Sequence, residues 1–200
     1  METNKLIFKR LIREYEFILE DLKDLKNIKE KVDNEFMEHL SEIDTENVLE
    51  GGGVADAAES WSKSKKDIKE LEAAEQDDRD PVFKKIFRKI VVKCHPDKLI
   101  EPTEKEVLYY TNIYNDVIEA NEDQDWGLLI RTAIKLEIEI PEEAYSKVEE
   151  IQEDLNKLKA KQEAILNSAS WNWYHTKDSN GQEEILQNHL NFLKNFNKGL

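Results

Sequence analysis

The chain has 200 residues, of which 36% are charged and 39% hydrophobic, with only 6 glycines and 4 prolines. This composition favours long helices over sheet, so we expect an all-α protein. The net charge of -15 argues against general binding to nucleic acid, because an acidic chain repels phosphate backbones.

One cysteine, Cys94, excludes an internal disulfide and a cysteine-rich zinc site, and it fits a reducing compartment. The N-terminal residues lack the apolar core of a secretory signal peptide. No run of about 18 apolar residues is present, so we expect no membrane span. Together these features predict a cytoplasmic protein.

A long helix is predicted from Leu6 to about Ile43, because apolar residues recur there at helical spacing without a glycine or proline. Part of its apolar stripe has the alternating spacing of four and three residues that is typical of a heptad seam. This seam consists of Leu11, Tyr15, Ile18, Leu22 and Leu25. Three glycines at 51–53 then break the chain. Residues 1–50 are therefore predicted to form an N-terminal coiled-coil arm.

The next region, residues 54–120, contains three predicted helices. The first, Val54 to Gln76, is weakly amphipathic. Asp80 and Pro81 start the second, because aspartate caps a helix and proline suits its first position; it should run to about Lys93. Residues 103–106 have the form of a capping box, which predicts the third helix, ending near residue 120.

The last 80 residues are predicted to add further helices. Within residues 121–140, an apolar-rich helix from Trp126 to Ile138 should pack on the preceding helices. Residues 141–200 should hold a coiled-coil helix from Pro141 to about Leu166, then a terminal helix from residue 185 to 196. The seam of the first of these consists of Val148, Ile151, Leu155, Leu158, Gln162 and Ile165.

Between those two helices, the sequence indicates an irregular segment around Trp171, Trp173 and Tyr174, followed by a turn at Asn180 and Gly181. The three aromatic side chains are interpreted as anchors that fix the last helix to the coiled coil. An exposed cluster of this kind could instead bind a client or partner.

The predicted helix from Val82 to Cys94 has two different sides on a helical wheel. One side is apolar and consists of Phe83, Ile86, Phe87, Ile90, Val91 and Cys94. The opposite side is cationic and consists of Lys84, Lys85, Arg88, Lys89 and Lys93. Val92 should lie among the cations. Residues 81–100 hold six Lys or Arg and one acid, a net charge of +5 in a chain of -15.

Directly after this basic helix come His95, Pro96, Asp97 and Lys98, and then a capped helix. Here the sequence resembles the J-domain (DnaJ-like) family over about residues 54–120. In that family two antiparallel helices form the core, and the loop between them carries a His-Pro-Asp tripeptide. The resemblance implies a J-like helical hairpin combined with a long helical stalk. The flanking segments look like small viral or phage J-domain proteins.

The resemblance implies a co-chaperone, with no enzymatic activity of its own, that docks on a DnaK-type chaperone and stimulates its ATPase. His95, Pro96 and Asp97 match the tripeptide. The residues that match the docking surface are Lys84, Lys85, Arg88, Lys89, Lys93 and Lys98. The sequence departs from the family in lacking the Tyr-x-x-Leu-Gly signature of the first helix, a Gly/Phe-rich linker and zinc-binding cysteine pairs.

The chemistry of these residues supports the same interpretation. Proline fixes its own φ and disfavours helix at the preceding residue, so His95 and Asp97 would be held at a rigid corner. A rigid polar corner loses little entropy on docking. The cationic side would steer it toward an acidic partner, and salt should weaken that attraction.

Plainer interpretations stay open. The main alternative function is a coiled-coil scaffold or adaptor that keeps a J-like fold without ATPase stimulation.

His95 could simply favour a helix C-terminus. A metal site joining Cys94 and His95 to His175 or His189 is disfavoured by spacing and ligand number, so no metal or cofactor is expected. The two heptad seams could form an intramolecular antiparallel coiled coil, which favours a monomer, or either could form a homodimer.

Overall fold

The computed structural model describes residues 2–45, 80–95 and 103–197, and these residues confirm the all-α class. The helices are α1 (Glu2–Thr45), α3 (Pro81–Cys94), α4 (Glu104–Asp123), α5 (Trp126–Lys135), the 3-10 helix η2 (Glu142–Ser146), α6 (Val148–Leu166), α7 (Ala169–His175) and α8 (Ser179–Asn197). The helix predicted between Val54 and Gln76 lies outside the described residues. None of the described helices is long and apolar enough to cross a membrane.

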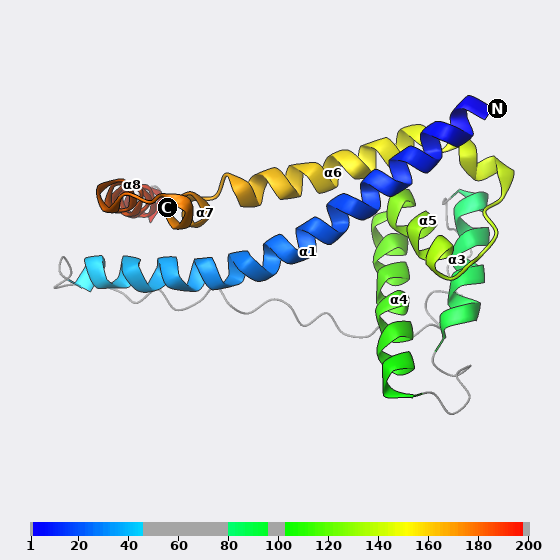
Figure 1. The fold of residues 1–200 in the computed structure, drawn as a ribbon, viewed down its shortest axis with the longest axis horizontal. Helices are drawn as coiled ribbons and strands as arrows, with labels where there is room; N and C mark the ends of the chain where they lie inside the picture. Colours follow the sequence, from blue (N-terminus) through cyan, green and yellow to red (C-terminus); the bar gives the residue numbers. More distant parts are fainter. Residues whose placement is uncertain (1, 46–79, 96–102, 198–200) are drawn as a thin grey trace.

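Three helices, α3, α4 and α5, form what we call the head (Figure 1). α3 and α4 run in opposite directions side by side, and α5 packs on both of them near the end of α4. The Phe83 ring of α3 meets the Trp126 ring of α5 edge to face, with centroids 5.1 Å apart. The head also packs on the first half of α1, so that its core continues into the core around Leu11 and Tyr15.

The close contact of α5 with α1 depends on Gly127. A Cβ atom at this position would lie 2.3 Å from ring carbons of Tyr15, a distance that no side chain tolerates. The Tyr15 hydroxyl in turn donates a hydrogen bond of 2.7 Å to Asp125, the N-cap of α5. The absence of a side chain at Gly127 therefore allows Tyr15 to lie flat against the start of α5.

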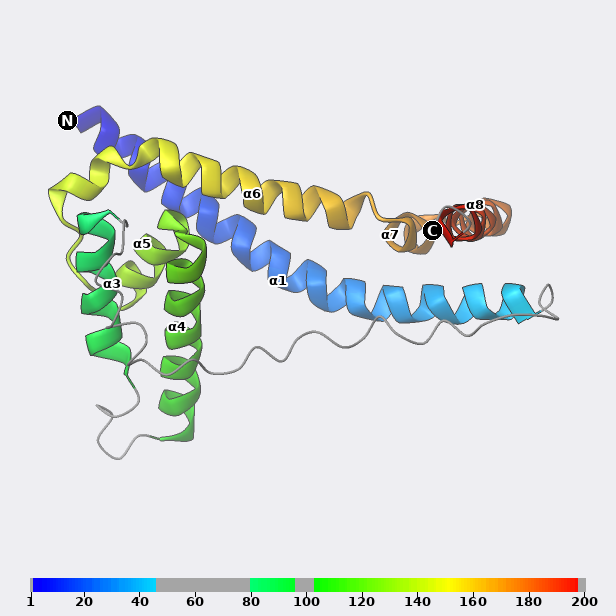
Figure 2. The ribbon, with the colours of Figure 1, turned by 180° about the vertical axis from the view of Figure 1, so that it is seen from behind.

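α6 lies along the first half of α1 within one chain, but the antiparallel pairing that we expected is wrong. Phe8 meets Tyr145, with ring centroids 4.9 Å apart, and Lys159 pairs with Glu14 at 2.6 Å. Further along both helices, Gln162 donates a hydrogen bond to Asp21. Contacts that advance together along both segments require a parallel arrangement, which Figures 1 and 2 also show.

The parallel arrangement follows from the position of the head. The head packs on the first half of α1, and the segment after α5 leads back to the N-terminal part of α1, where Tyr145 of η2 meets Phe8 (Figure 1). A short 3-10 turn, η2, then precedes α6, where a single helix from Pro141 was predicted. α6 therefore starts beside the start of α1 and runs in the same direction.

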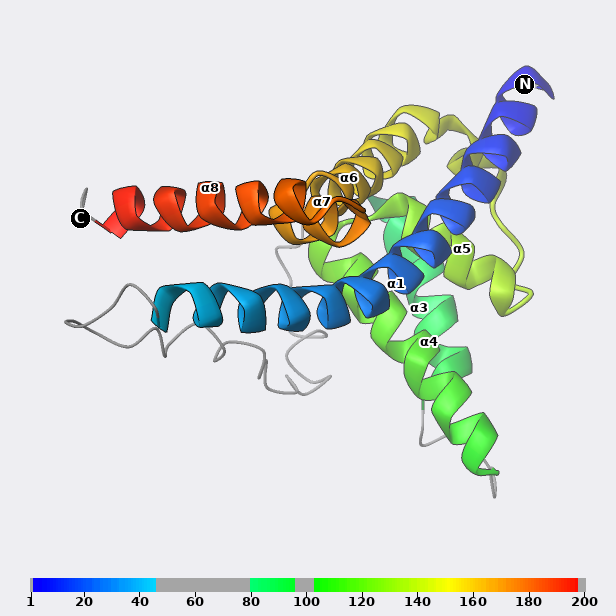
Figure 3. The same ribbon diagram turned by 60° about the vertical axis from the view of Figure 1, so that its left-hand side comes forward.

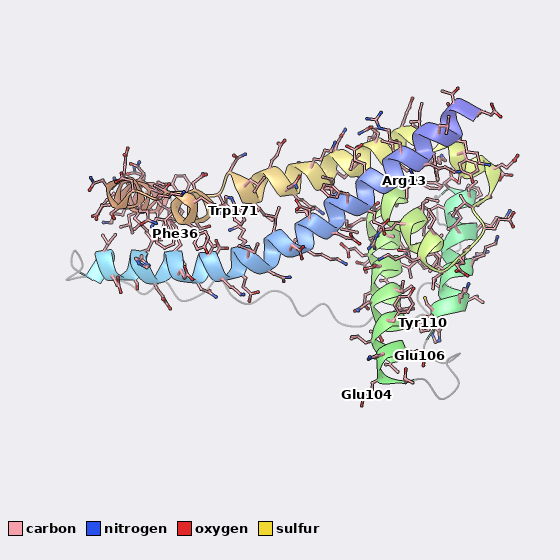
Figure 4. All side chains as sticks on the ribbon, in the orientation of Figure 1. Arg13, Phe36, Glu104, Glu106, Tyr110 and Trp171 are labelled. Atoms are coloured by element: carbon pink, nitrogen blue, oxygen red, sulfur yellow. The ribbon has the colours of Figure 1, made fainter. Side chains whose placement is uncertain are left out.

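At the far end from the head, α7 and α8 pack against α1 from Lys29 onward, and we call this part the arm (Figure 3). It has a separate apolar core, whose buried members are Phe36, Leu40, Trp173, Leu186 and Leu190. Figure 4 labels Phe36 on α1 and Trp171 on α7, where the two helices meet.

Two local predictions in this part were wrong. The aromatic segment is a helix, α7, because Ser168 accepts a hydrogen bond from the Trp171 amide and Trp173 is buried. The residues predicted to form a turn, Asn180 and Gly181, lie in the first turn of α8, where the Asp178 carboxylate accepts a bond of 2.9 Å from the Gly181 amide. Capping by serine and aspartate supplies the acceptors that free helix amides need.

Candidate functional site

The candidate site is the outer side of α3, and its position is set first by the N-terminus of that helix. The Asp80 carboxylate accepts a hydrogen bond of 2.7 Å from the Val82 amide, which confirms the predicted cap. It also pairs with Lys147 at 2.8 Å. Burial tends to raise the pKa of Asp80, but these two hydrogen bonds outweigh it and lower the pKa below its usual value. The start of α3 is thereby tied to the start of α6.

The inner side of α3 is apolar and buried, as predicted, with Phe83, Ile86, Ile90 and Cys94 in the core. Burial raises the pKa of the Cys94 thiol to about 11, so that this group stays neutral near pH 7. Cys94 is therefore a packing residue, since thiol reactivity and metal binding need the thiolate. In the part of the chain that is described, no three His, Cys, Asp or Glu side chains are grouped to hold a metal ion.

The outer side of α3 forms a basic ridge, which we define as Lys85, Arg88, Lys89 and Val92. The three cations are exposed, and Val92 is 57% exposed among them, as the sequence predicted. No acidic residue occurs anywhere in α3. The ridge therefore presents positive charge with one apolar side chain along about two turns of a helix.

Lys84 and Lys93 lie beside the ridge, and their surroundings differ from those of the ridge cations. Lys84 is half-buried. The Lys93 ammonium donates a hydrogen bond to the Leu136 carbonyl at the C-terminal end of α5, so it has a partner inside the head. A cation is favourable at that position, because the carbonyls that end a helix carry a partial negative charge. No local sequence pattern indicates this contact between residues 43 positions apart.

His95 ends α3. Its backbone is extended, with φ -61° and ψ 128°, and its amide donates a bond of 2.9 Å to the Val91 carbonyl. This conformation is the one that a following proline imposes. The half-buried imidazole meets the edge of the Tyr114 ring on α4, with centroids 6.1 Å apart. The other residues of the predicted loop, Pro96, Asp97 and Lys98, lie outside the described residues.

Tyr114 was not singled out from the sequence, yet it is the aromatic neighbour of His95. Burial raises the pKa of its hydroxyl, and the adjacent Cys94 adds to this effect. Tyr114 lies one helical turn before Val117, a fully buried residue of α4. The packing of α4 on α3 therefore fixes the surface against which the His95 ring lies.

The free end of α4 lies next to this corner of the head. The predicted capping box is confirmed, with both Thr103–Glu106 hydrogen bonds present. Glu104, Glu106 and Tyr110 mark this end of the hairpin in Figure 4. Three apolar side chains are exposed on the same two turns, namely Val107, Leu108 and Tyr109. Three consecutive residues of a helix point in different directions, so the sequence by itself indicates only that at least one of them is exposed.

This arrangement combines exposed cations, one imidazole and exposed apolar side chains, which are groups that can bind the surface of another protein. No family model matches the chain, and neither a curated protein nor a solved structure matches it.

Proposed function

We propose that the protein is a co-chaperone that docks on a DnaK-type chaperone and stimulates its ATPase. The observation that carries the proposal is the continuity of the basic ridge with His95. The ridge occupies the outer side of α3, and the same helix ends at His95, directly before Pro96 and Asp97. A cationic helix that leads into a His-Pro-Asp segment between two antiparallel helices is what the J-domain resemblance implies.

The electrostatics of the ridge support docking on an acidic surface. Three exposed cations lie on one side of α3, in a chain whose net charge is -15. Such a local reversal of charge would orient the protein during encounter with an acidic partner. Added salt should weaken this effect, because exposed charges are screened over about 8–10 Å at physiological ionic strength.

His95 is the residue that we propose acts on the partner. Its backbone is held by the Val91 carbonyl, and its ring lies against Tyr114. A side chain held in this way loses less conformational entropy on binding than a freely rotating one. The roles of Pro96 and Asp97 in shaping and completing the segment rest on the resemblance.

The decisive experiment is single-turnover ATP hydrolysis by a DnaK-type chaperone in the presence of the full chain. We expect stimulation by the wild-type protein and its loss in His95→Gln. Tyr114→Phe is the matched control, because it keeps the ring beside His95 and should keep the stimulation. Absence of stimulation by the wild type with several such chaperones at low salt would contradict the proposal.

The ridge is tested separately by charge reversal. Arg88→Glu or Lys89→Glu should weaken the apparent affinity for the chaperone roughly tenfold, a change of about 1.4 kcal/mol. Lys161→Glu on α6 reverses an exposed charge away from the head and should leave the affinity unchanged. Equal effects of Lys89→Glu and Lys161→Glu would show that only net charge matters.

The alternative function, a scaffold or adaptor without ATPase stimulation, is favoured by the arm. The arm has its own core and extends away from the head, so it can bind a partner independently of the basic ridge. The seam between α1 and α6 is filled within one chain, which supports a monomer as the working state. Binding of partners without any effect of His95→Gln would favour this alternative.

A further inference from the structure

The terminal helix α8 carries two neighbouring apolar seams. One seam includes Leu186 and Leu190, which are buried against α1 and α7. The other consists of Ile185, His189 and Phe192, spaced by four and then three residues, and we call it the outer seam. Such spacing places the three side chains in one line along a helix. A helix with two adjacent seams is typical of a bundle in which it has neighbours on two sides.

The outer seam becomes more exposed along the helix. Ile185 and His189 are half-buried, and the His189 ring meets Phe36 of α1 with centroids 5.3 Å apart. The next ring in the line, Phe192, stacks on His189 at 6.4 Å and is 61% exposed. The outer seam therefore starts at the core of the arm and ends at the exposed Phe192 ring.

α8 is poor in charged residues. Only Glu183, Glu184 and Lys194 are charged among its 19 residues, whereas 36% of the whole chain is charged. Charged residues are depleted from the centres of protein interfaces, and large aromatic residues are enriched there.

The charge of the arm indicates which kind of partner fits. Residues 29–45 of α1 contain six acidic and two basic residues, and residues 169–197 contain three acidic and two basic residues. One of the acidic residues, Asp33, is paired with Lys29 at 2.6 Å. The arm thus has a net charge of -5. Two copies of this chain would bring two such charges together, which is unfavourable, whereas a cationic helix would be attracted.

We infer that the outer seam of α8 is the docking surface for a positively charged amphipathic helix of another protein. The partner's apolar residues would pack on Phe192 and its neighbours, and its cations would face the acidic residues of the arm. This inference is independent of the proposed action on a chaperone, because the arm and the basic ridge lie at opposite ends of the molecule.

The test uses the full chain and a fluorescent helical peptide of about 18 residues with leucine at heptad a and d positions and lysine elsewhere. We expect saturable binding, measured by fluorescence anisotropy, that Phe192→Asp weakens at least about tenfold. Phe192→Ala, which adds no charge, should also weaken it. Phe17→Asp is the matched control, because Phe17 is 66% exposed on the part of α1 that packs with the head.

Three results would overturn the inference. The first is equal binding by wild type, Phe192→Asp and Phe17→Asp, which would mean attraction by net charge alone. The second is equally tight binding of a peptide with glutamate in place of lysine. The third is a homodimer in light scattering that Phe192→Asp dissociates, which would make a second copy the occupant of the outer seam.

Discussion

At the scale of single residues, the Asp125 carboxylate joins α5 to α1. It caps α5 by accepting a hydrogen bond of 2.7 Å from the Leu128 amide, and it accepts another of 2.7 Å from the Tyr15 hydroxyl of α1. Asp154 of α6 lies nearby and accepts a bond of 2.8 Å from the Trp126 amide. Burial, with a further contribution from Asp154, raises the pKa of Asp125 to about 6 against the hydrogen bonds that lower it.

This shift predicts that the protein is more stable in mild acid. The folded-state pKa of Asp125 exceeds its unfolded value of about 3.9, so its contribution to stability is complete below that value and is lost as pH rises through about 6. We expect the free energy of unfolding in urea to be about 1 kcal/mol higher near pH 5 than near pH 7.5. Asp125→Asn keeps the cap and should remove this difference; an unchanged pH dependence would assign it to other groups.

Lys93 and Lys89 are neighbouring cations on α3 with different structural roles. Because the Lys93 ammonium binds the Leu136 carbonyl, Lys93→Met should lower the free energy of unfolding by about 1 kcal/mol. Lys89→Met removes an exposed cation of the ridge and should change stability by less than about 0.5 kcal/mol. Urea denaturation of both variants at the same salt concentration tests this, and equal losses would show that the Leu136 contact contributes no stability.

At the scale of helices, the contact of α5 with α1 determines whether Gly127→Ala stabilises or destabilises the protein. Helix propensity alone would predict the wrong direction. Gly127→Ala should stabilise an isolated helix by about 1 kcal/mol. In the protein the new methyl group would overlap the Tyr15 ring, so we expect destabilisation by about 1–3 kcal/mol in thermal or urea unfolding.

A second substitution separates this overlap from other effects. Tyr15→Leu removes the ring that the methyl group of Gly127→Ala would meet. The loss of unfolding free energy caused by Gly127→Ala should therefore be smaller in the Tyr15→Leu background than in the wild type. If the losses of unfolding free energy in the two single variants add up to the loss in the double variant, α5 does not approach α1 at Tyr15.

At the scale of the whole molecule, the parallel direction of α1 and α6 fixes how the arm extends from the head. Lys159 and Glu14 form an ion pair at 2.6 Å, so a zero-length carbodiimide reagent should join them by an amide bond within one chain. Peptide mass spectrometry after digestion identifies the linked pair, and Lys159→Gln should abolish it. Links from Lys159 to acidic residues after residue 30 instead would indicate an antiparallel arrangement.

The charge distribution follows from the same architecture. The basic ridge lies on the head, and the arm, with a net charge of -5, lies at the other end of α1. The length of α1 keeps these two surfaces apart, so each remains available to a different partner.

Features set by local spacing were predictable from the sequence. The Asp80 cap, the Thr103–Glu106 capping box and the two-sided character of α3 depend on residues within a turn or two of one another. The position of His95 after the basic helix is of the same kind. Helical periodicity and capping fix such features whatever the rest of the chain does.

What the sequence did not determine depends on residues far apart in the chain. Two heptad seams indicate a pair but not its direction, which the packing of the head on α1 decided. The need for glycine at position 127 follows from the Tyr15 ring, and the partner of Lys93 lies 43 residues away. Local sequence thus determined the longer helices and the charged side of α3. Only the tertiary structure decided which surfaces face each other, because those contacts arise from packing between elements.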